Sequence, residues 1–379
     1  MNKLQEASAA LASEATINNA TIDTPDDLIC PASSIFDNTA VRAALVEAIG
    51  QSTDARDVRA ASVATLAMAQ KTGRLAIQAA FEADPFNARA TTRAYSYLTD
   101  QMVHEVLYVA TAKLHPLPNP TEGERISLIA VGGYGRGEMA PQSDVDLLFL
   151  TPYKITPWAE SVIESMLYIL WDLKLKVGHA SRTIKDCIRL AREDYTIRTS
   201  LVEYRFLAGD EALSKQLGRR LWSELFKSTA AEFIEAKLEE RAERHRKQGG
   251  QRYVVEPNVK EGKGGLRDLQ SLYWIGKYVN GVKQASELVD RKVFTAEEYA
   301  TFKKAEDFLW AVRCHLHLIT GRPSDQLTFD LQVEVAAKMG YEDGRGRRAV
   351  EYFMQDYFRR ATQVGDVTCV FFTAQEASF

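Results

Sequence analysis

Apolar residues recur at helical spacing through much of the chain. Between residues 39 and 115 they recur among good helix formers with few breakers, as Val58 and Leu66 illustrate, and this pattern predicts a helical region. The segment 114–123 (LHPLPNPTEG) follows with three prolines and a glycine, residues that end helices and introduce turns. A different kind of structure is therefore expected beyond it.

Short apolar runs come next, and they predict β-strands. Residues 126–131 (ISLIAV) and 145–150 (VDLLFL) are two such runs, each of a length that suits a buried strand. Residues 176–183 (KVGHASRT) can form a third strand. Between the second and third, apolar residues of 158–176 lie at helical spacing and predict an amphipathic helix. Helical sequence is then expected to about Phe206.

Beyond residue 208 the chain is predicted to be helical, with one interruption. That interruption, residues 249–268 (GGQRYVVEPNVKEGKGGLRD), holds five glycines and a proline, which would be costly in a helical region unless they served a purpose. Together the patterns predict an α+β protein. Its expected parts are a disordered tail (1–38), an N-terminal helical region (39–115), an α/β core (116–208) and an all-helical domain (209–379).

Composition narrows the classes of function. The 379 residues exceed one ordinary core, so more than one unit is expected. With 47 Lys and Arg against 51 Asp and Glu, the surface as a whole does not attract nucleic acid, although a local basic patch could bind a polyphosphate. No apolar run approaches the roughly 20 residues that span a bilayer, and the N-terminus lacks a secretory pattern. A cytoplasmic protein with no nucleic-acid or membrane partner is expected.

The segment 131–150 (VGGYGRGEMAPQSDVDLLFL) carries the candidate chemistry. It is expected to form a strand, a glycine turn, a short helical turn, a loop and a second strand. Gly132 and Gly133 lack a Cβ, so the backbone there can turn sharply and bring its amides close to phosphate oxygens. Asp144 and Asp146 lie two apart, so on a strand both project from one face.

Two carboxylates on one face repel each other, and bound cations would remove the repulsion. Mg²⁺, or Mn²⁺ in its place, prefers such oxygen ligands, and a pair of metal ions can clamp an in-line phosphoryl displacement. Either feature alone has an ordinary explanation, a plain turn or a solvated strand edge. Their order and spacing between two apolar strands favour a metal-dependent phosphoryl-transfer site with Asp144 and Asp146 as the metal ligands.

With its glycine pair followed by Asp-x-Asp, this segment resembles the nucleotidyltransferase superfamily that includes DNA polymerase beta. A narrower resemblance is to the bifunctional uridylyltransferase/uridylyl-removing enzyme family. It runs from about Arg42 to near the C-terminus. It is carried by the same segment and by GHASRT, LVEYRFLAGD, VEPNVKEGKGGLRDLQSLYWIGKY, LTFDLQVEVAAKMGY and AVEYFMQDYFRRA. The fold that the resemblance implies is a polymerase-beta-like nucleotidyltransferase core with a small mixed sheet, between N-terminal helices and a C-terminal all-helical domain.

The resemblance also implies a reaction. UTP and a tyrosine hydroxyl of the nitrogen regulatory protein PII would give PII-UMP and pyrophosphate, as a signal of nitrogen status. Family members normally continue into an HD-type phosphohydrolase domain, which removes UMP, and ACT domains, which sense glutamine. No His-Asp pair here resembles the HD motif. The chain is therefore expected to be a piece of a longer protein or a short homologue, in either case without uridylyl-removing activity.

Superfamily members usually have a third carboxylate, which the predicted third strand lacks. Glu203 is the nearest acid in a family-like segment and is the candidate catalytic acid, with an ion pair on a helix surface as the alternative. His179, on that strand, could contact substrate or hold a structural hydrogen bond. Arg136 follows the glycine pair closely enough to reach a phosphate, and Ser143 could bind phosphate or shape the turn.

Cations of the glycine-rich interruption are further candidates for nucleotide binding. Lys260, Lys263 and Arg267 stand among its glycines and could neutralise triphosphate charge or position the PII loop. A solvated loop followed by a helix cap is the alternative. His315 and His317 lie two apart in a predicted helix, where side chains point nearly opposite ways, so a shared metal ion is not expected.

Two other functions fit the same residues. An adenylyltransferase acting on glutamine synthetase has a related catalytic core and would prefer ATP to UTP. A non-catalytic nucleotide-binding partner of PII would bind UTP without releasing pyrophosphate, and the missing third carboxylate keeps this alternative open. Polymerase-like modification of nucleic-acid ends is disfavoured by the net charge of -4.

Overall fold

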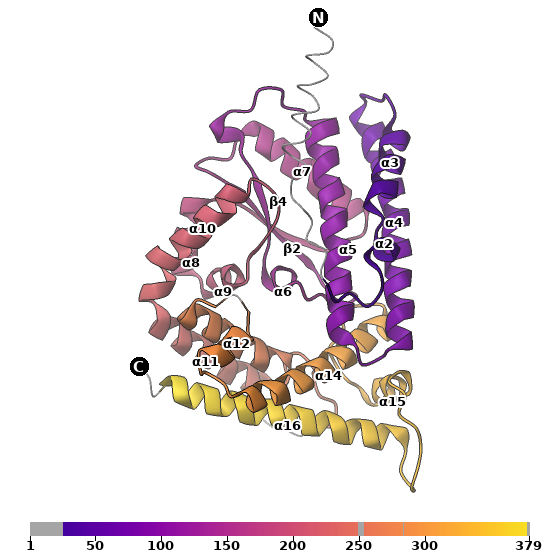
Figure 1. Ribbon diagram of the computed structural model, residues 1–379, viewed down its shortest axis with the longest axis vertical. Helices are drawn as coiled ribbons and strands as arrows, with labels where there is room; N and C mark the ends of the chain where they lie inside the picture. Colours follow the sequence, from indigo (N-terminus) through magenta and orange to yellow (C-terminus); the bar gives the residue numbers. More distant parts are fainter. Residues whose placement is uncertain (1–25, 249–253, 283, 377–379) are drawn as a thin grey trace, which may run out of the picture.

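The computed structural model describes residues 26–248, 254–282 and 284–376. In the view of Figure 1, a small sheet is flanked on one side by long N-terminal helices, and a group of C-terminal helices closes the lower end. These parts confirm the predicted α+β fold, with its small mixed sheet, N-terminal helices and helical C-terminal part.

The N-terminal region is built from helices that lie side by side. Their bounds are α2 (Ala32–Ile35), α3 (Asn38–Ile49), α4 (Ala55–Ala83) and α5 (Ala88–Tyr108), continued by the π-helical turn η1 (Val109–Leu114) and the 3₁₀ turn η2 (Glu122–Glu124). Asp37 and Asp54 begin α3 and α4, because each carboxylate accepts a backbone N–H of the first turn, at 2.9 and 2.8 Å.

The beginning of the described chain is packed against this region. The sequence predicts a disordered tail to residue 38; residues 1–25 lie outside the described residues, whereas Ile35 and Phe36 are buried in the N-terminal core. α2 meets α4 at Gly73, where a Cβ would lie 2.3 Å from the Ile35 carbonyl oxygen. Residues 32–36 are therefore ordered, because Ile35 and Phe36 are buried against the N-terminal helices, which the composition of this segment does not indicate.

Four strands form one mixed sheet in the order β3-β2-β1-β4. Their bounds are β1 (Ser127–Ala130), β2 (Val145–Thr151), β3 (Val177–Thr183) and β4 (Arg205–Gly209). β2 and β3 are parallel and joined through helix α7 (Pro157–Asp172), whereas β1 runs antiparallel to both β2 and β4. The first three strands and α7 lie where the sequence predicts them.

The fourth strand corrects the prediction of helix to about Phe206. Helices α8 (Ile184–Glu193) and α9 (Tyr195–Val202) end before it, and β4 then pairs with β1. Five residues are too few for periodicity to separate strand from helix. The unpaired backbone groups along the edge of β1 decide the outcome, because they need hydrogen-bond partners.

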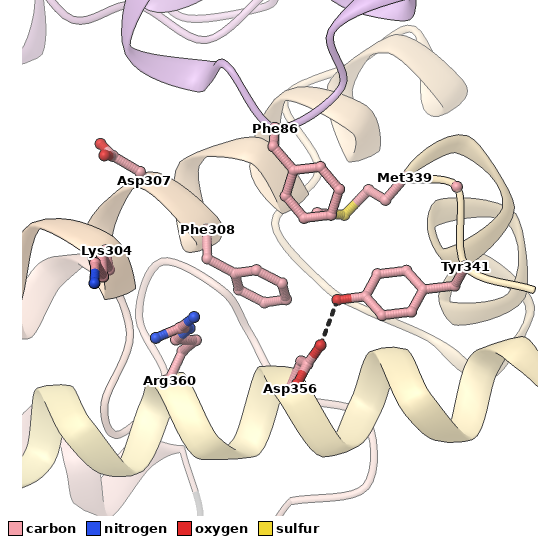
Figure 2. A pocket seen from close by; sticks show the side chains of 9 residues that line it. Phe86, Lys304, Asp307, Phe308, Met339, Tyr341, Asp356 and Arg360 are labelled. Carbon is pink, nitrogen blue, oxygen red and sulfur yellow. Dashed lines mark hydrogen bonds between the residues drawn. The ribbon is translucent and has the colours of Figure 1, made fainter. Parts of the chain in front are cut away.

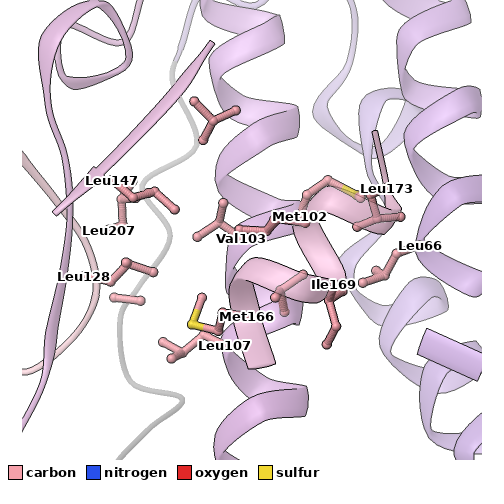
Figure 3. Packing of buried hydrophobic residues seen from close by; sticks show 14 of the residues in the cluster. Leu66, Met102, Val103, Leu107, Leu128, Leu147, Met166, Ile169, Leu173 and Leu207 are labelled. Atoms are coloured by element: carbon pink, nitrogen blue, oxygen red, sulfur yellow. The ribbon is translucent and has the colours of Figure 1, made fainter. Parts of the chain in front are cut away.

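Alternate side chains of the sheet enter two separate cores. Leu128 and Leu147 face helices α5 and α7 (Figure 3). The intervening residues Ile129 and Leu148 face the opposite side, against α8 and α10 (Glu211–Glu224). Because α10 packs on the sheet, the predicted boundary at residue 208 falls before the last helix that covers it.

The remaining helices form the C-terminal domain. Their bounds are η3 (Phe226–Ser228), α11 (Ala230–Lys247), α12 (Leu266–Asn280), α13 (Glu287–Asp290), α14 (Ala296–Thr320), α15 (Phe329–Lys338) and α16 (Ala349–Glu376). Their hydrophobic core also takes in Phe81, Ala88 and Ala140, so this domain shares its core with the rest of the molecule. None of the described helices combines the length and the apolar character needed to cross a membrane.

Acidification is expected to weaken this shared core through His315. Its ring stacks on Phe81 with the centroids 4.4 Å apart, its Nε2 hydrogen-bonds the Pro85 carbonyl oxygen at 2.9 Å, and burial lowers its pKa from 6.5 to about 4. The unfolded chain takes up this proton near pH 6.5 and the folded chain only near pH 4. The contribution of the neutral His315 to the free energy of unfolding is therefore fully present above pH 6.5, and it is lost as the pH falls from 6.5 to about 4.

Urea unfolding at pH 7 and pH 5 measures this effect. His315→Gln keeps an amide N–H for Pro85 but does not titrate, so its free energy of unfolding should fall by about 2 kcal/mol less than that of the wild type between these pH values. An equal fall in both proteins would contradict the prediction.

Candidate active site

The two predicted metal ligands lie at the start of β2. Asp146 is in the strand and half-buried, whereas Asp144 is exposed one residue before the strand begins. The buried residues Val145 and Leu147 alternate with them and enter the core. The two carboxylates therefore project from the same face, as the spacing predicts.

The glycine turn lies directly against this pair. It forms the short helix α6 (Gly132–Gly135), which follows β1. Gly132 has φ +60°, and a Cβ there would lie 3.3 Å from Asp146 Oδ2. The preceding Val131 N–H donates to the Asp146 carbonyl oxygen at 3.1 Å. Glycine at 132 thus meets two requirements at once, a left-handed backbone and a close approach to a carboxylate.

The charge of the pair is not matched by the protein residues around it. In the described part of the chain, neither Asp144 nor Asp146 accepts a hydrogen bond or forms an ion pair with its side chain. Burial raises the pKa of Asp146 and repulsion from Asp144 adds to this, while the charge of Lys260 acts in the opposite direction. A cation would stabilise the ionised pair, so these residues fit a divalent metal ion.

No third acid reaches the pair from the neighbouring strand. Gly178 of β3 lies opposite Asp146, and a Cβ there would be 2.4 Å from Asp146 Oδ1. The next residue, His179, is exposed and meets Trp171 edge-on with the centroids 6.2 Å apart. Among the described residues, no group of three or more His, Cys, Asp or Glu side chains could hold a metal ion. A metal ion here would complete its shell from water and phosphate, as Mg²⁺ commonly does.

Residues 254–268 of the glycine-rich interruption are described, and within them residues 257–268 form a compact strap that leads into α12. Asn258 Oδ1 accepts two backbone N–H groups of its first turn, at 2.7 and 3.0 Å. Gly264 has φ +77°, and a Cβ there would lie 2.2 Å from the Ala361 carbonyl oxygen of α16. At this position glycine lets the strap pack directly on helix backbone. Residues 249–253, which begin the interruption, lie outside the described residues.

A buried carboxylate anchors the far end of the strap. Asp268 is fully buried and accepts from the Gly264 N–H at 2.8 Å, from His245 Nε2 at 3.0 Å and from the Arg244 guanidinium. Burial would raise the pKa of Asp268, but the His245 hydrogen bond and the Arg244 charge hold it below its usual value. Gly265 is the N-cap of α12, so Asp268 does not cap this helix but ties it to α11.

Lys260 of the strap is the cation whose charge acts on the acidic pair. It is half-buried, and no described carboxylate lies within ion-pair distance of it. Burial lowers the pKa of Lys260, and the nearby charges of Arg313 and Arg267 lower it further. Because Lys260 also lowers the pKa of Asp146, the fold brings the strap close to the carboxylates, which are more than a hundred residues away in the sequence.

The other two predicted cations of the strap differ from each other. Arg267 is bound within the protein, because it donates to Glu261 at 3.2 Å and to Gln270 at 2.8 Å and lies over the Trp274 ring at 5.3 Å. Burial lowers the pKa of Arg267. Lys263 is half-buried and makes no ion pair with the described residues. A contact of either with nucleotide stays a prediction.

The buried carboxylate of Glu203 joins the core to the helical domain. Arg136 Nη1 and Glu203 Oε2 are 2.6 Å apart, with side chains 9% and 1% exposed. Trp274 Nε1 and Lys277 Nζ, both on α12, donate to the same carboxylate at 2.6 and 3.1 Å. Burial would raise the pKa of Glu203, but the charges of Arg136 and Lys277 hold it below its usual value. The sequence does not predict a role for Trp274 or Lys277 at the site. Their spacing of three residues on a helix is the only local sign that they share a partner.

These contacts show how Glu203 and Arg136 are held in the structure, whereas a catalytic role of Glu203 and a phosphate contact of Arg136 stay predictions. Glu203 is not in an exposed helix ion pair, because it lies buried at the end of α9. Both carboxylate oxygens of Glu203 accept hydrogen bonds, so Glu203 could act as a third metal ligand only if some of these bonds were broken. Arg136 is likewise committed to Glu203 and, at 3.5 Å, to Glu138. Its Nη2 would be 3.4 Å from a Cβ at Gly133, so this guanidinium supports the glycine turn.

Ser143 shapes the turn that leads into the acidic pair. Its Oγ accepts the Ala140 N–H at 2.9 Å, and its own N–H donates to the Ala140 carbonyl oxygen at 3.0 Å. This is one of the two roles that the sequence leaves open for Ser143. Phosphate binding by its hydroxyl stays a prediction.

A pocket of about 480 Å³ lies elsewhere, between the helical domain and the turn that joins α4 to α5. Figure 2 shows the rings of Phe86, Phe308 and Tyr341 around it, with Tyr341 donating to Asp356 at 2.8 Å. None of the site residues predicted from the sequence lines this pocket. It is therefore no part of the candidate active site.

Comparisons with known proteins match both halves of the chain. Residues 120–204 match the nucleotidyltransferase domain, and residues 232–372 match the GlnD PII-uridylyltransferase family. The chain is 66% identical over 344 residues to the bifunctional uridylyltransferase/uridylyl-removing enzyme of Ruegeria pomeroyi, and 62% identical over 352 residues to that of Cereibacter sphaeroides. The chain corresponds to the N-terminal, nucleotidyltransferase part of this enzyme family.

The matched region takes in 91% and 92% of this chain but only 38% of each of these two relatives. The chain therefore spans about two fifths of the length of these relatives, and their names describe the longer proteins. The nucleotidyltransferase match contains the glycine turn, the acidic pair and Glu203, whereas the uridylyltransferase match contains the strap and α12. The candidate active site is thus assembled from both matched segments.

Glu203→Ala is expected to lower the free energy of unfolding by about 3–5 kcal/mol, because it removes the counter-charge of the largely buried Lys277 and leaves the buried Arg136 only its more distant contact with Glu138. Urea unfolding measures the loss. Glu122→Ala is a matched control: its carboxylate is 85% exposed and pairs with Arg125 at 3.1 Å on the surface, so a change within about 1 kcal/mol is expected. Similar losses of unfolding free energy in both variants would contradict the prediction that the ion pairs of Glu203 stabilise the fold more than a surface pair does.

Gly178→Ala is expected to disturb the acidic pair while leaving the fold intact. The added Cβ would meet Asp146 Oδ1, the end of a side chain that can rotate away. Thermal unfolding should therefore change little, whereas the affinity for Mn²⁺ in the presence of UTP, measured by electron paramagnetic resonance, should fall about tenfold or more. Gly344→Ala, where a Cβ meets nothing within 4 Å, is the control. Unchanged Mn²⁺ affinity in Gly178→Ala would count against a metal at Asp146.

Proposed function

We propose that the chain transfers UMP from UTP to a tyrosine hydroxyl of the nitrogen regulatory protein PII and releases pyrophosphate, in the signalling of nitrogen status. The observation that carries the proposal is the pair Asp144 and Asp146 beside the glycine turn, which has no hydrogen-bond or ion-pair partner among the described residues and lies inside the segment that matches the nucleotidyltransferase domain. The match of residues 232–372 to PII-uridylyltransferase supports UTP and PII as the substrates. Our proposal covers the transfer reaction only.

Asp144 and Asp146 would hold Mg²⁺, or Mn²⁺ in its place. When bound, such an ion neutralises triphosphate charge and favours attack by a hydroxyl. The protein's own residues do the rest. Gly132 keeps a side chain away from Asp146, and Gly133 leaves room for the buried guanidinium of Arg136, which packs against the turn. Positioning of this kind supplies much of the acceleration of such reactions.

Lys260 would supply positive charge on the strap side of the site. Its half-buried amine has no described carboxylate partner, and burial together with Arg313 and Arg267 disfavours its charge. A bound triphosphate would reverse this, because its negative charge favours the ammonium form. Lys263 and Arg267 are further candidates for the same ligand.

Mass spectrometry of PII after incubation with this chain, Mg²⁺ and UTP tests the proposal. A UMP adduct on a tyrosine of PII is expected with the wild type. In Asp146→Asn the transfer rate is expected to fall by roughly a thousandfold or more, because the amide is uncharged and binds a metal ion more weakly than a carboxylate does. Glu122→Gln, an exposed surface carboxylate, should retain full activity.

The same experiment separates the alternatives. A parallel incubation with ATP, and with glutamine synthetase as acceptor, would give adenylylation if the chain were an adenylyltransferase. Binding of UTP without adduct and without pyrophosphate would instead indicate a non-catalytic partner of PII. Wild-type rates in Asp144→Asn and Asp146→Asn would refute the metal site.

A further inference from the structure

The loop that leads into the acidic pair is tied to the helical domain by a histidine. The Gln142 N–H donates to Nδ1 of His317, on α14, at 3.2 Å. His317 is 0% exposed. Arg74 donates to the Pro141 carbonyl oxygen at 2.6 Å, so two side chains from different parts of the chain hold the two polar groups of the single peptide that joins Pro141 to Gln142.

The hydrogen bonds determine which form of His317 is present. Because Nδ1 accepts an N–H, it carries no proton, and Nε2–H is free to donate to Asp325 Oδ1 at 3.1 Å. Arg313 Nε donates to the same oxygen at 2.8 Å. Burial lowers the pKa of His317, which keeps the ring neutral. A second proton on the ring would place N–H against N–H and break the bond to the loop.

The same chain of bonds continues into the strap. The Asp325 carbonyl oxygen accepts the Val259 N–H at 2.8 Å, and Lys260 is the next residue. One buried histidine and one aspartate therefore connect the loop before the metal ligands with the segment that carries the facing cation. The neighbouring His315 has no part in this connection, since its partners are Pro85 and Phe81.

Asp144 is the ligand that depends most on this connection. Asp146 lies within β2, where the ladder to β1 and β3 fixes the backbone. Asp144 precedes the strand and is exposed, so its position follows from the loop that Gln142 belongs to. A loop free to move would carry Asp144 away from Asp146 and weaken a shared metal site.

We propose that His317 is a positioning residue of the active site, which holds the Gln142 loop and thereby Asp144 in place and couples them through Asp325 to the strap. This inference rests on the proposed function to the extent that Asp144 is a metal ligand. His317 touches neither metal nor substrate and acts through the backbone.

Two substitutions divide the bonds of His317 between them. In His317→Asn the side-chain oxygen can take the place of Nδ1 and still accept the Gln142 N–H, whereas the bond to Asp325 is lost. In His317→Gln the amide nitrogen can take the place of Nε2 and still donate to Asp325, whereas the loop loses its acceptor. His315→Gln is the control, since it changes the neighbouring histidine without touching the loop.

The measurement is Mn²⁺ affinity by electron paramagnetic resonance, with UTP carrying an imido group between its α and β phosphorus atoms, alongside the melting temperature of each variant. His317→Gln is expected to bind Mn²⁺ about tenfold more weakly than the wild type, His317→Asn within about threefold, and His315→Gln like the wild type. In transfer assays the loss in His317→Gln should appear mainly as a higher Mg²⁺ requirement and be partly relieved by excess Mg²⁺.

A purely structural role would give a different order. If His317→Asn and His317→Gln lost Mn²⁺ affinity equally, in step with their melting temperatures, or if His317→Gln bound Mn²⁺ as the wild type does, the positioning role would be overturned while the proposed function stood. If the wild type bound no Mn²⁺ with the UTP analogue, the proposed function would fail first and this inference with it.

Discussion

The buried charge of Glu203 is the constraint on which the arrangement of the two domains depends. A carboxylate removed from water without partners is very costly, so its three donors must all be in place for the fold to tolerate it. Arg136 comes from the glycine turn, and Trp274 and Lys277 come from α12. The turn and the helical domain can therefore reach their positions only together, which makes the candidate site a product of both.

The acidic pair presents the opposite situation in the same molecule. Glu203 and Asp268 have their charges fully matched inside the protein, whereas Asp144 and Asp146 face Lys260 without a direct partner in the described residues. A metal ion bound to a triphosphate carries charges of both signs and would satisfy both sides. Charge without a direct partner, in a structure that pairs the buried charges of Glu203 and Asp268, is a physical argument for a binding site.

What the sequence predicts well is what one segment determines by itself. The first three strands, helix α7, the glycine turn and the shared face of Asp144 and Asp146 follow from alternation and helical periodicity within a few dozen residues. β4 and the role of Glu203 do not. β4 forms because β1 has an edge to complete, and the partners of Glu203 lie 67, 71 and 74 residues away, so no local pattern distinguishes it from an exposed acid.

The two histidines of α14 show why this limit falls where it does. Helical spacing correctly indicates that His315 and His317 point in different directions, and their partners are Pro85 and Gln142, 230 and 175 residues away. Periodicity determines the direction of a side chain, but only the tertiary fold determines what lies there. Residues that carry chemistry gather in short segments and can be recognised. Residues that hold those segments in place are dispersed, although the orientation of the carboxylates depends on them just as much.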